Sequence, residues 1–113
     1  MTGEAGNEEG VLPVACNLPG PEGAERRREV AETLSGGVLR VYELEDGYAF
    51  GFPGDAEWAE RLVGFISFER VCCPFFAFEL AFEPGGGPIV LRVRGPEGAK
   101  QFVEAELTAL RVR

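Results

Sequence analysis

The sequence contains no histidine, and this absence excludes several kinds of site. Without imidazole there can be no histidine metal ligand, no Ser-His or Cys-His nucleophile pair, and no histidine proton shuttle. Basic residues are also scarce, with 11 Lys and Arg against 19 Asp and Glu, and the formal net charge is -8. A net acidic surface repels phosphate backbones and anionic lipids, so we expect neither nucleic acid nor a membrane surface as a partner.

The sequence also lacks a long apolar run and an even set of cysteines. No apolar stretch approaches the roughly 18 to 20 residues that span a bilayer. Residues 1–10, MTGEAGNEEG, are acidic and glycine-rich, unlike the basic start of a signal peptide. The three cysteines are an odd number and two are adjacent, whereas secreted disulfide frameworks are normally even. We therefore expect a cytoplasmic protein with reduced thiols.

The length and composition indicate one folded domain preceded by a short arm. The chain has 113 residues, of which 45% are hydrophobic and 27% charged, a composition typical of globular proteins. The first ten residues carry almost nothing apolar, so we expect a disordered acidic arm over 1–10 and a single domain over 11–113.

Hydrophobic periodicity and turn residues predict an α+β fold. Asp46-Gly47 and the glycines at 85–87 are typical of hairpin turns, and Asp55 is a good helix cap. The predicted order is helix, hairpin, helix, hairpin, helix, with helices at about 21–35, 56–71 and 96–110 and strands at 38–43, 48–52, 75–82 and 89–93. This order predicts a four-stranded, mostly antiparallel sheet with helices packed on it, and not a doubly wound parallel sheet.

The adjacent cysteines Cys72 and Cys73 are the main candidates for chemistry. Pro74 disfavours helical backbone at Cys73, so the pair lies where a helix ends and a strand begins. Adjacent cysteines do not readily bond to each other, because the small ring strains the disulfide. Two adjacent thiolates can instead share one soft metal ion.

Three further residues belong to this candidate site. If the helix reaches Cys73, Glu69 lies one turn before both thiols, on an otherwise apolar stripe. A carboxylate there is exposed at the end of the stripe, paired with an arginine, or functional. Arg70 would favour thiolate, although the negative end of the helix opposes it. Cys16 would supply a third sulfur if the chain folds back.

These residues predict a binding protein for a soft metal or metalloid ion. The candidate ligands are Cys16, Cys72, Cys73 and Glu69, with Arg70 in a supporting position. The candidate ions are zinc, copper(I), mercury(II) and arsenite. Zinc would need a fourth ligand, such as Glu69 or water.

Two other interpretations remain open. In the first, the protein is a non-enzymatic interaction module that forms a homodimer, and the cysteines are buried filler. The aromatic cluster Phe65, Phe68, Phe75, Phe76, Phe78 and Phe82 would then be core, or in part a contact surface. In the second, the protein is a thiol enzyme that activates a cysteine without histidine. We rank the enzyme last, and the sequence nominates no catalytic residue.

Several segments together resemble a family of small bacterial proteins without an assigned activity. They are Ala15-Cys16-Asn17-Leu18, the run from Glu69 to Leu80 that begins ERVCCPFF, the Gly-rich turn that follows it, and Gly95-Pro96-Glu97-Gly98. The resemblance covers most of residues 15–107, and its ERxCCPF block is the most specific part. It implies an association with heavy-metal resistance loci, and it carries over Cys16, Cys72, Cys73 and Glu69 as site positions.

Overall fold

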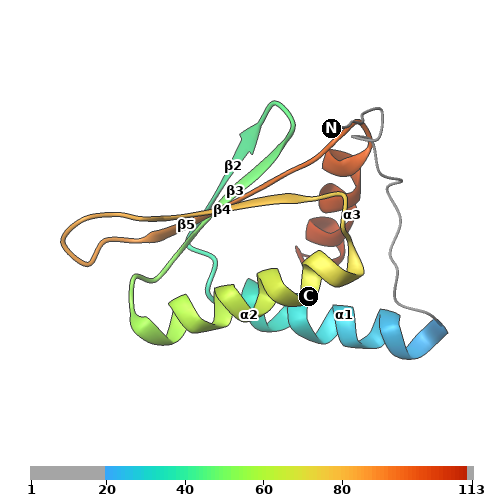
Figure 1. Cartoon of the computed structure of the whole chain (residues 1–113), viewed down its shortest axis with the longest axis horizontal. Helices are drawn as coiled ribbons and strands as arrows, with labels where there is room; N and C mark the ends of the chain where they lie inside the picture. The colour runs from blue at the N-terminus through green and yellow to red at the C-terminus, as the bar shows by residue number, and fades with distance from the viewer. Residues whose placement is uncertain (1–19, 112–113) are drawn as a thin grey trace, which may run out of the picture.

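The computed structural model describes residues 20–111 as three helices and four strands (Figure 1). Their order is α1 (Gly20–Ser35), β2 (Arg40–Leu44), β3 (Gly47–Phe52), α2 (Ala56–Cys72), β4 (Ala77–Phe82), β5 (Ile89–Arg94) and α3 (Ala99–Arg111). This is the predicted α-ββ-α-ββ-α order and an α+β fold. The arm expected over residues 1–10 lies outside the described residues.

The four strands form one antiparallel sheet in the order β2-β3-β5-β4. The two hairpins meet at the centre, where β3 pairs with β5 and Phe50 lies opposite Leu91. Burial along β5 alternates as a half-buried strand requires. Ile89, Leu91 and Val93 face the core, as the sequence predicts.

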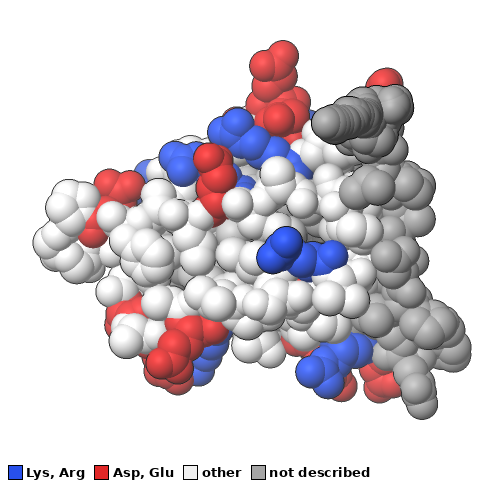
Figure 2. All heavy atoms as spheres, viewed as in Figure 1, with Lys and Arg blue, Asp and Glu red and all other residues white. Residues whose placement is uncertain are grey.

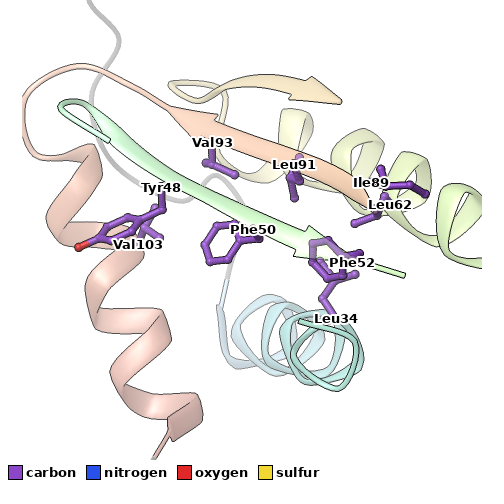
Figure 3. Packing of buried hydrophobic residues seen from close by; sticks show 9 residues of the cluster. All are labelled: Leu34, Tyr48, Phe50, Phe52, Leu62, Ile89, Leu91, Val93 and Val103. Carbon is purple, nitrogen blue, oxygen red and sulfur yellow. The ribbon is translucent and has the colours of Figure 1, made fainter. Parts of the chain in front are cut away.

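The helices cover one face of the sheet. α1 and α2 lie side by side beneath it, and α3 stands beside the end of α2 (Figure 1). Figure 3 shows how β3 and β5 point their apolar side chains toward α1 and α3. Tyr48 lies against Val103 of α3, and Phe52 lies against Leu34 of α1. The main core is thus a layer between this sheet face and the helices.

Three predicted boundaries are wrong by two or three residues. The first strand begins at Arg40 instead of 38, and β4 begins at Ala77 instead of 75 because Phe76 N–H closes a turn on the Cys73 carbonyl. The last helix begins at Ala99 instead of 96. Gly98 has a φ of 97°, which no helical residue adopts, so Pro96 opens a turn and not the helix.

Charged side chains of both signs are intermixed on the face shown in Figure 2, without one continuous acidic patch. Several are paired locally, including Arg61 with Glu57 at 2.6 Å and Lys100 with Glu43 at 2.5 Å. Within residues 20–111, none of the helices combines the length and the apolar composition needed to cross a bilayer.

Candidate functional site

Helix α2 positions the two cysteines at its C-terminal end. The helix starts at a cap in which the Asp55 carboxylate accepts the Trp58 N–H at 2.9 Å. It ends at Cys72, and Cys73 is the cap, with its N–H donating to the Glu69 carbonyl at 2.6 Å. Glu69 therefore lies one turn before the thiols, as predicted.

The end of the helix explains how both cysteine side chains become buried. Adjacent residues of a continuous helix project about 100° apart, so both would not normally enter one side of it. Cys73 has already left helical geometry, with φ -130° and ψ 76°, as expected for a residue before Pro74. Both side chains are 0% exposed, and the Cys73 thiol donates to the Cys72 sulfur at 3.6 Å.

The sulfurs lie in a small apolar cluster apart from the main core. Its fully buried members are Cys72, Cys73, Phe75 and Ala99, and the rings that pack against it belong to Phe68, Phe76 and Phe102. Ala99 is the first residue of α3, so the positive end of α3 lies at the cysteines and offsets the negative end of α2. The start of α3 thus opposes the negative end of α2 at the thiols, while their burial among apolar side chains favours the neutral form.

Glu69 is the one buried charged side chain of the described residues, with 3% of its surface exposed. Exposure at the end of the apolar stripe, one of the three alternatives for this carboxylate, is therefore wrong. Glu69 lines a cavity of about 110 Å³ between the sheet and the helices. The remaining lining is apolar apart from Ser35. Pairing with an arginine and a functional role are the two alternatives that remain for this buried carboxylate.

The other predicted site residues, Arg70 and Cys16, are not among the described residues that form the cluster around the thiol pair. Arg70 is exposed, whereas the cysteines are buried, so its guanidinium lies outside their apolar cluster. Cys16 lies outside the described residues. Between Gly20 and Arg111, no three Cys, Asp or Glu side chains converge as a metal-binding group. This part of the chain therefore supplies a pair of adjacent thiols, and the roles of Cys16, Cys72, Cys73, Glu69 and Arg70 as ligand or support stay predictions.

The cavity beside Glu69 was missed by sequence reasoning. Phe65, Phe76 and Phe78, which the sequence indicates as core, line it together with residues of α1, α3 and the sheet. A hollow depends on how three helices meet a sheet, and hydrophobic periodicity does not specify that. The one local signal was the carboxylate of Glu69 in an apolar stripe.

Comparison with protein-family models, with curated proteins and with solved structures found no match to this chain.

Proposed function

We propose that this protein binds a soft metal or metalloid ion through the thiols of Cys72 and Cys73. The observation that carries the proposal is the separation of 3.6 Å between the two sulfur atoms in one buried cluster. Thiolates are the ligands that soft ions prefer. The resemblance of the ERVCCPFF segment to proteins associated with heavy-metal resistance points the same way, as does the reducing cytoplasmic setting that we expect from the sequence.

The sulfur separation favours an ion whose angle between two bound thiolates is bent and not linear. Metal–sulfur bonds of about 2.3 Å at a tetrahedral angle place the sulfurs about 3.8 Å apart, whereas a linear ion needs about 4.6 Å. The observed 3.6 Å is close to the bent value. Among the four candidate ions, zinc and arsenite suit this pair better than linear copper(I) or mercury(II).

Burial sets the conditions for binding. Both sulfurs are fully enclosed, so an ion reaches them only when the end of α2 opens locally. After closure, the apolar rings exclude water that would compete for the ion. We propose Cys16 as a third sulfur ligand, Glu69 as a weak ligand or a base near the site, and Arg70 as a supporting charge.

Equilibrium binding of arsenite and zinc to the full chain tests the proposal. We expect one ion per chain, with at least a hundredfold weaker binding in Cys72→Ala/Cys73→Ala. Cys16→Ala should weaken binding less, because the vicinal pair remains. Ser67→Ala, an exposed change on the same helix, is the matched control and should bind like the wild type. Equal binding by the wild type and the double variant would exclude the proposal.

The complete burial of the sulfurs also favours a second candidate, an interaction module in which the cysteines are filler. A homodimer would use β4, the outer strand of the sheet among the described residues, where Phe82 is 60% exposed. Sedimentation equilibrium should then show a dimer that Phe82→Glu converts to a monomer. A monomeric wild type at all concentrations would exclude this candidate.

A further inference from the structure

The cavity beside Glu69 has the size and lining of a site for a small hydrocarbon group. Its volume is about 110 Å³, and its walls come from α1, α2, α3 and the inner face of the sheet. An apolar cavity of about 150 Å³ is known to hold benzene, so this one accepts an alkyl group or closely fits one ring. Filling it would remove hydrocarbon from water, which favours binding.

The cavity and the thiol pair share a wall. Phe76 and Phe102 line the cavity, and both pack against the cluster that contains Cys72 and Cys73. Their ring centroids are 6.0 Å apart. Glu69 also lines the cavity, while its carbonyl accepts the Cys73 N–H. Cys72 and Cys73 do not themselves line the cavity, so a substituent on an atom bound to the sulfurs has to pass these two rings to reach it.

The count of thiols points to the kind of ligand. The described residues bring two sulfurs together, and inorganic arsenite, in which arsenic makes three bonds, would need the proposed third sulfur of Cys16 as well. An arsenic atom that already carries one carbon substituent needs only two thiolates to complete its coordination. Such a ligand would use the two sulfurs for arsenic and the apolar cavity for its organic group.

We propose that the ligand is an organic compound of trivalent arsenic, R–As(OH)₂, in which R is a hydrocarbon group no larger than one ring. This inference rests on the proposed binding of soft ions by Cys72 and Cys73. Two arsenic–sulfur bonds form and two arsenic–oxygen bonds break. Each thiol proton leaves with one hydroxide as water, so two waters are released and no atom changes oxidation state.

Competitive titration with arsenite and with phenylarsine oxide, which hydrates to R–As(OH)₂, tests the inference. Dithiothreitol serves as the reference dithiol without a cavity. For each dithiol, the measured quantity is the affinity for the phenyl compound divided by the affinity for arsenite. We expect this ratio to be at least about tenfold larger for the wild type than for dithiothreitol, which corresponds to about 1.4 kcal/mol. The same preference in protein and dithiothreitol would overturn the inference.

A substitution that fills the cavity provides a second test of the inference. Ala31 lines the cavity from α1, and Ala31→Leu should lower the affinity for the phenyl compound about tenfold while leaving arsenite within twofold. Ala105→Leu, the same change at an exposed site of α3, is the control and should alter neither. Val38→Ile, a smaller filling change, replaces Ala31→Leu if that variant does not fold.

The outcomes separate the two proposals. Arsenite binding without a phenyl preference, or a preference unchanged in the filled cavity, overturns this inference and leaves the proposed function standing. No binding of either compound, or equal binding by Cys72→Ala/Cys73→Ala, overturns both.

Discussion

Two buried polar features distinguish individual residues of this protein, the thiol pair and the carboxylate of Glu69. Apolar residues would fill both places without the cost of desolvation. The sequence identified all three residues from their types and spacing. It did not establish that both sulfurs are enclosed, because enclosure depends on Ala99 and Phe102, which are distant along the chain. Local patterns thus nominate the candidate residues, and tertiary packing decides their surroundings.

A hydrogen bond between side chains connects β3 to α3. The Tyr48 hydroxyl on β3 donates to Glu104 Oε2 at 2.5 Å. We expect Tyr48→Phe to lower the free energy of unfolding by about 1–2 kcal/mol, because a bond to a charged acceptor is lost and Glu104 is left less well satisfied. Urea denaturation measures this. Tyr42→Phe, on exposed β2, is the control and should stay within about 0.5 kcal/mol; equal effects would contradict the assigned role.

At the scale of elements, hydrophobic periodicity predicted the order of helices and strands because each element has its own pattern of burial. The starts of β4 and α3 were wrong for a shared reason. Phe75 and Pro96 suit the start of a strand and of a helix by residue type. In the structure, however, the first residues of both predicted segments form turns. The position of Gly98 at positive φ is set by the chain reversal into α3, and residue type alone does not reveal it.

Two glycines should respond in opposite ways to replacement by alanine. A Cβ on Gly47 would lie 1.8 Å from the Val93 carbonyl oxygen, so Gly47→Ala must displace backbone where β3 meets β5. We expect a loss of about 1–3 kcal/mol in the free energy of unfolding. Gly64 lies within α2 with open space at its Cβ position, so Gly64→Ala should gain about 0.5–1 kcal/mol from helix propensity.

Chemical denaturation of both glycine variants against the wild type measures the difference. A stable Gly47→Ala protein would show that the central strands do not approach as closely as described. A destabilised Gly64→Ala protein would show that the exposed face of α2 is covered.

At the scale of the whole molecule, the thiol site lies where the end of α2, the turn into β4 and the start of α3 meet. The sequence predicted the architecture, but it did not predict the cavity or the shared wall of Phe76 and Phe102. These features arise from the angles between helices and sheet, which the pattern of apolar residues leaves undetermined. Ligand binding at this junction should therefore stabilise the entire domain.

Thermal unfolding with arsenite measures that coupling. At a ligand concentration one hundred times Kd, binding to the native state alone adds about 2.7 kcal/mol. For a domain of this size, we expect Tm to rise by about 10–20 °C. Cys72→Ala/Cys73→Ala should show no rise. A rise of the same size in the double variant would place the ligand elsewhere.

The central claim is that Cys72 and Cys73 together hold one ion. Arsenic X-ray absorption of the Cys16→Ala protein, loaded with one equivalent of arsenite, tests it most directly because it counts the sulfur neighbours of arsenic. We predict two sulfurs and one oxygen in the first shell. A first shell of oxygen alone, or with a single sulfur, would contradict the account.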